Sequence, residues 1–506
     1  MSYRCALLTV LVIAVYLAVM ASTNHVFTIL DDESIIITVA GHPILPTLRL
    51  FLEGGFQHEH PPASDILLHV WLIVTHYSFF ALRIFANIFY ALGVLFTALS
   101  ARRLAGTSAY WACIILGFAW PFAFQYGRIT GWYCCSFFLV ALATWLYVHI
   151  LENRSYWFWL AFILTAVVSV WTNYFAVAIL GLLLLDLLIF HRRIAREKIW
   201  LLLISAGIVI LSYLPLLHAT LTTLGTLTLG IASRAGLERI VAETGYPLFA
   251  IFGSAAVAPW FLPLSIPVIV ATAALLISIW FSPGRKWLVY FVLSMWLLEL
   301  SGHMNIKRVL FLLPWMFIAM ALAAFGSAAR FPRLASAAAG VIVIAGWIGI
   351  ASGKHYATTN LYEPWNQVAQ VVAGDARSGA TVISDSYPFF FYLNYQLGVE
   401  SETQAATGPD LGEFVYKSHG YKVFEADGQE ARLNELRGKV VLVSGSSMME
   451  SIQWTRAVEQ RLQQQCQTLG QYRAAPDPAV GFKAKYAAGV PVLPYRIVVT
   501  WFDCGR

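Results

Sequence analysis

The sequence predicts a polytopic α-helical membrane protein with about eleven transmembrane helices and a C-terminal extracytoplasmic α/β domain. Of its 506 residues, 59% are hydrophobic and only 12% are charged. Apolar runs of about 17 to 22 residues recur along the chain, and an α-helix needs this length to cross a bilayer. Because helices satisfy their own backbone hydrogen bonds in lipid, this composition indicates membrane-spanning helices and excludes a soluble globular protein.

The predicted spans form a transmembrane module over residues 1–352. The first, 5–23, is long for a signal peptide, so we interpret it as a retained helix. The segment 62–78 is apolar but short and begins at a Pro-Pro pair that fixes the backbone, so we interpret it as an interfacial helix in the first outer loop, 24–81. The other spans are 82–101, 109–125, 132–150, 156–171, 174–190, 199–217, 262–281, 287–301, 308–325 and 334–351.

The basic residues support this arrangement. If 62–78 does not span, the basic loops fall on one side of the membrane, which the positive-inside rule identifies as the cytoplasm. They comprise Arg4, Arg102, Arg103, Arg154, the run 191–198, Arg285, Lys286, Arg330 and Arg333. The outer face then receives 24–81, 125–133, 218–261, 301–308 and everything after about 352, which predicts a multi-pass protein of the inner or plasma membrane.

A few cations remain in the outer loops, against the topological bias. They are Arg49, Arg83, Arg128, Arg234, Arg239, Lys307 and Arg308. Each alone could be an ordinary loop charge, but together they indicate a site for an anion near the membrane surface. The net charge of +6 is spread over the loops and does not indicate a nucleic-acid partner.

The tail, residues 353–506, predicts a soluble α/β domain. "ATVISDS" and "KVVLVSGSS" are typical of buried strands, "MESIQWTRAVEQRLQQQ" of an amphipathic helix and "PYRIVVTWFD" of a late strand. Cys466 and Cys504 are the only cysteines of the tail. An oxidising, extracytoplasmic location makes them a predicted disulfide.

Three consecutive carboxylates, Asp31, Asp32 and Glu33, follow directly on the first span. Carboxylates at a membrane surface are costly unless they are solvated, paired or used. One of them could be a general base, and another could hold the loop by hydrogen bonds. The alternative is a charged helix end that anchors the span.

A second ionisable cluster, His58-Glu59-His60, stops at Pro61-Pro62. Alternate residues of an extended segment share a face, so His58 and His60 could bind a divalent metal together with an aspartate. No cofactor is otherwise indicated. The alternative is a polar rim at the entrance to the interfacial helix, with the prolines fixing Glu59 and His60 in place.

The order of these motifs resembles the GT-C glycosyltransferases, and in particular their protein O-mannosyltransferase and aminoarabinose-transferase branch. An Asp-Glu pair follows the first span and "HPPASDILLHVWL" opens an interfacial helix. Three later stretches, "ALRIFANIFYALGVLFTALSARRLAG", "QYGRITGWYCCSFFLVALATWL" and "NIKRVLFLLPWMFIAMALAA", are similar to further spans of that branch. The likeness covers roughly residues 1 to 350, and each motif alone is short.

The resemblance implies inverting transfer of a sugar from a polyprenyl-phosphate donor to an acceptor hydroxyl on a glycan, lipid or protein at the outer face. It implies that Asp32, or its neighbour Asp31, is the base, and that Glu59 is a further catalytic carboxylate. His60 stands where aminoarabinose transferases have a lysine, which leaves the sugar open. The expected substrate-binding residues are Glu33, His58, His60, Arg83, Arg128, Tyr133, His303, Lys307 and Arg308.

A transporter or flippase of a lipid-linked anion is the alternative function. Such a protein should carry polar or broken helices near the membrane midplane, often in two related halves. The spans here are mainly uniform and apolar, and the ionisable residues gather at one face, which favours an enzyme that works at one membrane surface.

Overall fold

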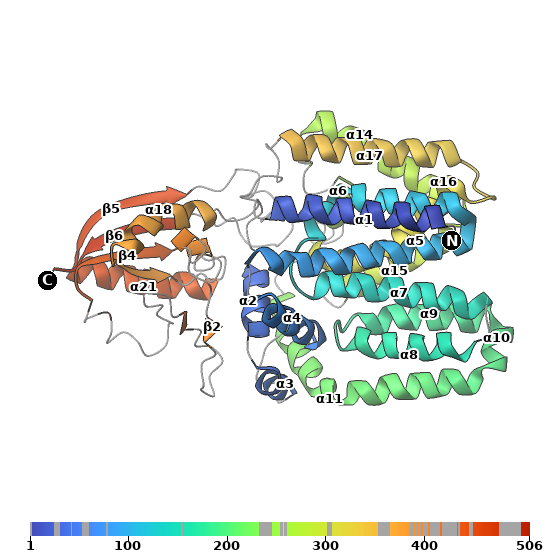
Figure 1. Cartoon of the computed structure of the whole chain (residues 1–506), viewed down its shortest axis with the longest axis horizontal. Coiled ribbons are helices and arrows are strands. Elements are labelled where there is room, and N and C mark those ends of the chain that lie inside the picture. Colours follow the sequence, from blue (N-terminus) through green and yellow to red (C-terminus); the bar gives the residue numbers. More distant parts are fainter. Residues whose placement is uncertain are drawn as a thin grey trace.

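The computed structural model describes two parts of the chain, a long helical bundle and a small mixed sheet beyond one end of it (Figure 1). The described residues are 3–24, 31–41, 43–52, 60–76, 79–152, 155–231, 245–253, 257, 261–300, 306–352, 365–384, 389, 392–393, 396–397, 403–404, 415–416, 433, 436–444, 449–474 and 497–505.

The bundle consists of antiparallel helices whose connections lie at its two ends (Figure 1). Its helices are α1 (Tyr3–Thr23), α2 (Asp31–Gly41), α3 (Ile44–Leu52), α4 (Ala63–Val74), α5 (Phe79–Ala119), α6 (Pro121–Tyr126), α7 (Trp132–Glu152), α8 (Tyr156–Val170), α9 (Ala176–Phe190), α10 (Arg192–Glu197), α11 (Ile199–Ile231), α13 (Tyr246–Gly253), α14 (Leu262–Trp280), α15 (Arg285–Leu300), the 3₁₀ helix η3 (Ile306–Leu312), α16 (Leu313–Phe325) and α17 (Pro332–Ser352).

Seven helices in the described part of the chain are long and apolar enough to cross a membrane. Shorter apolar helices include α8 and α9, with 15 residues each, or about 22 Å at 1.5 Å per residue. The helix α4, which we predict to be interfacial, has 12 residues and is too short to cross a hydrocarbon core of about 30 Å. The protein is therefore a multi-pass membrane protein, and the count of eleven spans remains a prediction.

Two of the predicted spans, 82–101 and 109–125, lie within and just after α5. Gly106 adopts a positive φ of 84°, which divides α5 into two helices across a kink. The second half ends at Ala119 because Pro121 starts the separate helix α6, so the predicted end at residue 125 was wrong. The residue before a proline avoids helical backbone angles, and Trp120 accordingly has ψ 119°.

The span predicted at 308–325 is also divided. Its first turns form η3, and the α-helix begins only at α16, where Pro314 occupies the first turn. Proline is tolerated there because the first-turn N–H groups lack partners within the helix. The irregular η3 segment carries Lys307 and Arg308.

The core of the bundle is built from α5, α7 and α16, which pack against one another. Residues Leu313 to Ala323 of α16 are all buried. A Cβ on Gly93 of α5 would lie 2.3 Å from the Phe137 ring of α7, so only glycine permits this close approach. The outer helices instead expose large apolar side chains such as Leu11 (57%) and Leu211 (66%), as expected of surfaces that face lipid.

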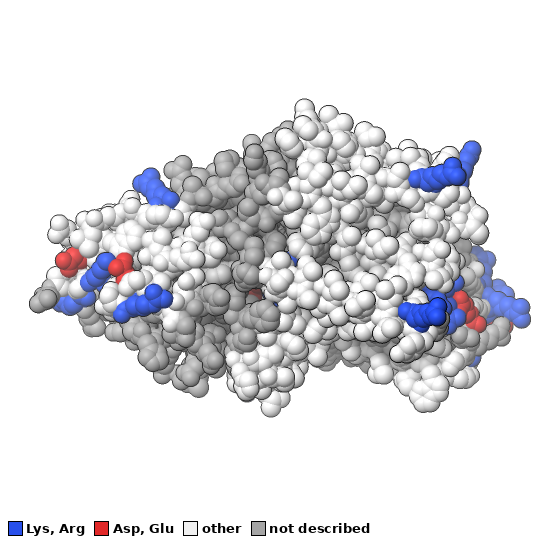
Figure 2. All heavy atoms as spheres, turned by 45° about the horizontal axis from the view of Figure 1, so that its top comes forward, with Lys and Arg blue, Asp and Glu red and all other residues white. Residues whose placement is uncertain are grey.

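On the face shown in Figure 2, the described Lys, Arg, Asp and Glu side chains lie mainly at the two ends, and the described atoms between them belong mostly to uncharged residues. The predicted cytoplasmic residues that are described lie at helix ends facing away from the sheet: at the start of α1, near the kink of α5, in α10, at the start of α15 and around the start of α17. We refer to this as the basic end. The helices α2, α3 and α4 lie at the opposite end, next to the sheet (Figure 1).

The tail forms a four-stranded mixed sheet. Its strands are β1 (Thr381–Ser384), β4 (Lys439–Ser444), β5 (Gln467–Ala474) and β6 (Ile497–Asp503), in the order β1-β4-β6-β5, with β1 parallel to β4 and the other pairs antiparallel. The helices are α18 (Trp365–Arg377) and α21 (Met449–Gln465), and a separate two-stranded ladder joins β2 (Thr403–Gln404) to β3 (Val415–Tyr416).

Alternation along β4 explains how the two helices sandwich this sheet. Val441 and Val443 belong to the hydrophobic cluster that contains Trp365 of α18. Val440 and Leu442 belong to the cluster that contains Leu462 of α21. Successive side chains of a strand point to opposite faces, so one short apolar strand serves both clusters.

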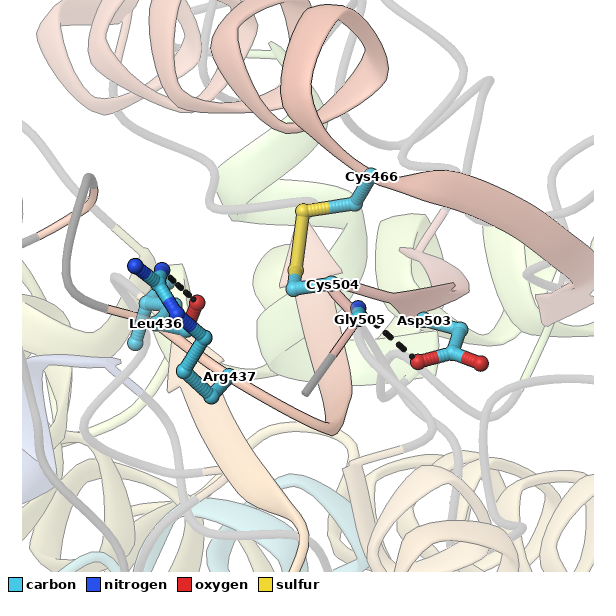
Figure 3. The surroundings of a disulfide bond; sticks show 6 residues. All are labelled: Leu436, Arg437, Cys466, Asp503, Cys504 and Gly505. Carbon is cyan, nitrogen blue, oxygen red and sulfur yellow. Dashed lines mark hydrogen bonds between the residues drawn. A yellow bond between two sulfur atoms is a disulfide. The ribbon is translucent and has the colours of Figure 1, made fainter.

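The predicted disulfide is confirmed. Cys466, just after α21, is bonded to Cys504, just after β6 (Figure 3). The predicted strands and the amphipathic helix are confirmed as β1, β4, β6 and α21. Strand β5, "QTLGQYRA", was not predicted, because its apolar residues are few and its outer positions are exposed.

Candidate functional site

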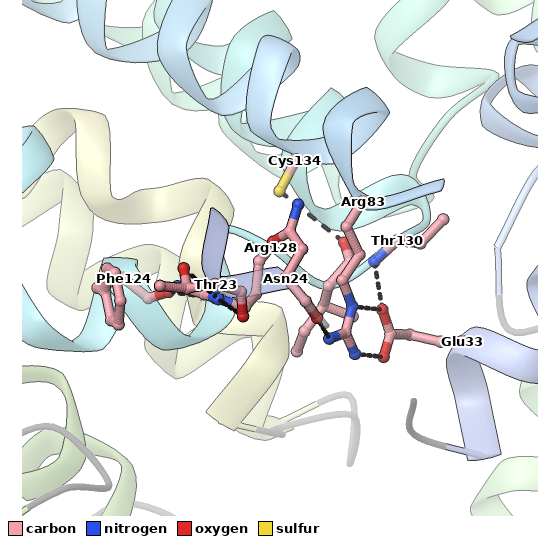
Figure 4. A network of polar contacts seen from close by, with 9 residues as sticks. Thr23, Asn24, Glu33, Arg83, Phe124, Arg128, Thr130 and Cys134 are labelled. Carbon is pink, nitrogen blue, oxygen red and sulfur yellow. Dashed lines mark hydrogen bonds and ion pairs between the residues drawn. The ribbon is translucent and has the colours of Figure 1, made fainter. Parts of the chain in front are cut away.

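The helix α2 is anchored to the bundle through Glu33. Its carboxylate accepts hydrogen bonds from Arg83 Nη2 (2.8 Å) and Nε (3.3 Å) and from the backbone N–H of Thr130 (2.8 Å) (Figure 4). Glu33 is fully buried and Arg83 is 6% exposed. A two-pronged arginine contact of this kind fixes orientation as well as distance. Glu33 therefore fixes the first turn of α2 against α5 and the loop before α7.

The loop from Gly127 to Gly131 makes this anchoring possible. Gly131 has a positive φ of 137°, and a Cβ there would lie 2.7 Å from the Ile36 side chain of α2. Only glycine combines that backbone angle with such close contact. The motif "RITGWY" thus brings the N–H of Thr130 to Glu33.

Two asparagines extend the network to the end of α1. Arg83 Nη1 donates to the carbonyl of Asn24 (2.9 Å), whose side-chain amide donates to Asn87 Oδ1 (2.9 Å). The Asn87 amide donates to the carbonyl of Gly127 (3.3 Å). Three segments far apart in the sequence are therefore joined by one set of buried hydrogen bonds.

Arg128 lies in the same region and is 1% exposed. Its Nε donates to the carbonyl of Phe124 (3.0 Å), and its Nη1 to the carbonyl and hydroxyl of Thr23 (3.2 Å each) (Figure 4). Thr23 ends α1, where the helix dipole favours a cation. Burial, and then the neighbouring Arg83, lowers the pKa of Arg128 to about 9 against an opposing effect of Glu33, so Arg128 remains cationic at neutral pH.

A crystal structure of ArnT from Cupriavidus metallidurans in the apo state matches this chain with a TM-score of 0.51 at 12% identity, over 98% of each chain. The chain has the GT-C fold of ArnT. The structure of ArnT bound to undecaprenyl phosphate gives a TM-score of 0.49 at 13% identity, over 99% of this chain and 98% of that one. No protein-family model and no curated protein matches the sequence. The resemblance inferred from the sequence motifs is confirmed at the level of the fold.

Several predicted site residues of this ArnT-like chain meet near the start of α7. The His60 ring lies 5.8 Å from the ring of Trp132, which stacks on Tyr133 at 4.3 Å. His60 is 3% exposed and Tyr133 is 2% exposed. Trp132 also contacts Phe311 of η3, with 6.3 Å between ring centroids. Trp132, at the start of α7, therefore contacts both His60 and η3.

Lys307 and Arg308 start η3, which packs against α7 and α6. Arg308 is 6% exposed, and Lys307 is partly buried. The two cations thus enter the site end beside α7, while Arg83 and Arg128 lie near the end of α1.

Other predicted site residues lie wholly or partly outside the described residues. Asp31 and Asp32 begin α2, but their side chains are not among the described ones. His58, Glu59 and His303 fall in segments that are not described. The described residues hold no group of three side chains that could bind a metal. The predicted divalent metal therefore has no support in the described part of the chain.

Sequence reasoning missed four residues that the structure brings to this site: Asn24, Asp65, Asn87 and Thr130. A usable signal was present for the two asparagines, since each is a polar residue at or within an otherwise apolar span. Asp65 carried no such signal, because an acidic residue near the start of a helix is common. Thr130 contributes its backbone N–H, which no side-chain pattern reveals.

A separate buried cluster lies at the basic end, away from the site. Asp186 of α9 accepts hydrogen bonds from the hydroxyls of Tyr147 and Tyr290 and from Lys286 Nζ (2.6 Å). His191 Nε2 lies 3.7 Å from the same carboxylate. This cluster joins α7, α9 and α15 and fixes the end of the bundle that carries the arginine-rich loops.

Proposed function

We propose that this protein is an inverting glycosyltransferase that moves a sugar from a polyprenyl-phosphate donor to an acceptor hydroxyl. The ArnT-like fold supports the reaction class. The observation that carries the proposal is the anchoring of α2: the Glu33 contacts with Arg83 and Thr130 fix the turn that begins with Asp31 and Asp32. A carboxylate on a turn that is fixed in this way suits a general base.

In this reaction Asp32, or its neighbour Asp31, takes the proton of the acceptor hydroxyl. The acceptor oxygen attacks the anomeric carbon of the donor sugar as the bond from that carbon to the phosphate oxygen breaks. A single displacement inverts the anomeric configuration. The base gains one proton, and the departing polyprenyl phosphate gains one negative charge.

The cations of the site stabilise that developing charge. Fixed positive groups in a site that excludes water act more strongly than they would in water. Glu33 holds Arg83, and we assign Arg128, Lys307, Arg308 and His60 to the phosphate. The Arg128 side chain donates hydrogen bonds to Phe124 and Thr23, so its contribution is that of a charge fixed in position.

We further propose that transfer takes place on the extracytoplasmic face of the inner membrane. The basic end of the bundle is opposite the site end, and the positive-inside rule assigns the basic end to the cytoplasm. The sheet and its disulfide lie beyond the site end, and disulfides persist in oxidising compartments. We propose that the sugar is a hexose or a pentose. The acceptor is a hydroxyl of a glycan, a lipid or a protein.

The test is a transfer assay with the purified full-length chain in lipid, using a panel of undecaprenyl-phosphate sugars and cell-envelope acceptors. Asp32→Asn keeps the size of the side chain and removes its basicity, so it should lower turnover about a hundredfold or more while undecaprenyl phosphate still binds. Asp31→Asn tests the neighbouring residue in the same assay.

Glu152→Gln is the matched control, because Glu152 is an exposed carboxylate paired with Arg103 at the basic end (3.2 Å). It should leave transfer unchanged. Near-normal turnover of both aspartate variants would refute the assignment of the base. Transport of the lipid across vesicles without any transfer product would instead support the flippase alternative.

A further inference from the structure

The short helix α10 carries a group of arginines that the proposed reaction does not use. It connects α9 to α11 at the basic end of the bundle (Figure 1). Ala195 is buried and Ile194 packs against the hydrophobic core, so this side of α10 faces the protein. Arg192, Arg193 and Arg196 are exposed. The positive charges of α10 therefore face outward.

Two of these arginines form an arrangement that is unfavourable without an anion. Arg193 Nε donates to Glu197 Oε1 one turn later (3.1 Å). Arg192 and Arg196 are also one turn apart, so their like charges share a face of the helix and repel each other. Neither forms an ion pair with a described carboxylate, and Arg192 Nε donates to the carbonyl of Ile189 (3.2 Å). An anion beside both guanidinium groups would remove this repulsion.

Exposed aromatic side chains adjoin this cationic face. Trp157 (78%), Trp200 (75%) and Phe190 (70%) are among the most exposed aromatic side chains in the described part of the chain. Phe190 ends α9, and Trp200 lies in the first turn of α11. The start of α8, with Trp157, is brought to the same place because Lys198 Nζ lies 4.2 Å from the centre of the Tyr156 ring. Tryptophan beside cations is typical of the boundary between lipid and water.

The surface that continues from these aromatic residues is apolar. The helix α11 is the least buried of the seven helices that could cross a membrane. Leu203 and Ile204 follow Trp200 on this helix and are exposed, as are Leu185 and Leu188 on α9. The acyl chains of a lipid can therefore lie along α9 and α11 while its phosphate reaches α10. An acidic peptide or a nucleic acid would make no use of this apolar surface.

We propose that α10 and its flanks bind the phosphate headgroup of an anionic phospholipid in the leaflet at the basic end. The headgroup site consists of Arg192, Arg196, Lys198, Trp157 and Trp200. The two arginines bind the phosphate, for which a guanidinium group offers a pair of donors. Lys198 adds a third positive charge, and the tryptophans flank the headgroup. This site is at the opposite end of the bundle from the transfer site and does not depend on the proposed function.

The test is a lipid titration of the full-length chain in detergent, with the bound lipids counted by native mass spectrometry. The probes are anionic phosphatidylglycerol and phosphatidylcholine with the same acyl chains, which has no net charge. Wild type should bind phosphatidylglycerol more tightly. Each cation near a lipid surface favours anionic lipid about fivefold, so Arg192→Gln with Arg196→Gln should lower the association constant for phosphatidylglycerol about 25-fold. The association constant for phosphatidylcholine should not change.

The matched control removes the same amount of charge from the same end of the bundle. Arg330 and Arg333 are exposed around the start of α17 and are not part of the headgroup site. Arg330→Gln with Arg333→Gln should therefore lower the association constant for phosphatidylglycerol by about threefold at most. An equal loss in the two double variants would mean that the net charge of the basic end attracts the lipid, and this would overturn the inference.

A second measurement needs no substitution. A phosphatidylglycerol with a photoreactive headgroup, carried at low abundance in phosphatidylcholine nanodiscs, should label the peptides that contain Trp157 and Trp200 more than the peptide around Arg330. Equal labelling of these peptides would overturn the inference even if the arginine variant of α10 does not fold. So would tight binding of polyglutamate by a wild-type chain that does not prefer phosphatidylglycerol to phosphatidylcholine, since the surface would then fit an acidic protein.

Discussion

Glu33→Gln is the sharpest test of how the site is held together. The substitution keeps the size of the side chain but removes the charge that faces Arg83, and it turns an NH₂ group toward a donor that is 2.8 Å away. Removing one partner of a buried ion pair typically costs 3 to 5 kcal/mol, because the other charge is left uncompensated. At about 1.4 kcal/mol per factor of ten, local opening should become two to four orders of magnitude more frequent.

Cys134 reports this opening directly. It is fully buried, and its thiol donates to the carbonyl of Gly127 in the same network (3.3 Å). The assay is the rate at which a thiol-reactive reagent labels Cys134 in the native protein, read by mass spectrometry of the peptide. Because labelling follows opening, Glu33→Gln should raise this rate by a comparable factor. Transfer activity should fall in parallel.

The double variant Glu33→Gln, Arg83→Gln supplies the control. It removes the stranded charge and leaves two neutral amides that can bond each other, so Cys134 should be labelled more slowly than in Glu33→Gln alone. The reasoning would be refuted if Glu33→Gln were labelled as slowly as wild type. It would also be refuted if the double variant were as labile as the single one.

Three further predictions concern other parts of the chain. Arg128→Ala should raise the donor concentration needed for half-maximal transfer about tenfold or more, since a charged contact to phosphate is worth about 1.5 to 3 kcal/mol, whereas Arg49→Ala at an exposed position should do little. The Cys466–Cys504 disulfide joins residues that are 38 positions apart in the sequence. Its reduction should lower the free energy of unfolding of the sheet, measured by chemical denaturation, by about 4 kcal/mol. Burial, and then Lys286, lowers the pKa of His191. The stability contributed by the neutral His191 is therefore present above about pH 6.5 and is lost as the pH falls below that value. His191→Gln should reduce this loss when the free energy of unfolding is measured across pH.

Each of these has a result that contradicts it. If the Arg128 and Arg49 variants needed the same donor concentration for half-maximal transfer, Arg128 would not contribute to binding the donor phosphate. An unfolding midpoint of the tail that does not respond to reductant would mean that the disulfide is dispensable. Identical acid sensitivity of wild type and His191→Gln would show that other groups govern the basic end.

The general arrangement could be predicted because it follows from chemistry that is local in sequence. Lipid requires long apolar helices, and every span predicted here corresponds to a helix in the structure. The division of α5 at Gly106 agrees with the two separate spans predicted at 82–101 and 109–125, whereas the break before Pro121 was missed because hydropathy alone does not reveal backbone angles. Strand β5 was missed because it lies at the sheet edge, where few apolar residues are needed.

The site was predictable in its members more than in their roles. One of the three carboxylates was expected to hold the loop by hydrogen bonds, and the contacts of Glu33 with Arg83 and Thr130 assign that role to Glu33, while its predicted contact with substrate stays a prediction. The choice between base and anchor among three adjacent carboxylates depends on partners 50 and 97 residues away in the sequence. Asp65 gave no signal because an acid near a helix start is common, and only its burial makes it unusual.

The position of β6 has a consequence for how the protein is made. This strand is the last of the sheet in the sequence, yet it lies between β4 and β5 and supplies the hydrogen bonds of both. The sheet therefore cannot be completed until β6 has been synthesised, after every helix of the bundle. Until then the facing edges of β4 and β5 are unpaired, so this period is when chaperones and proteases would act on the tail.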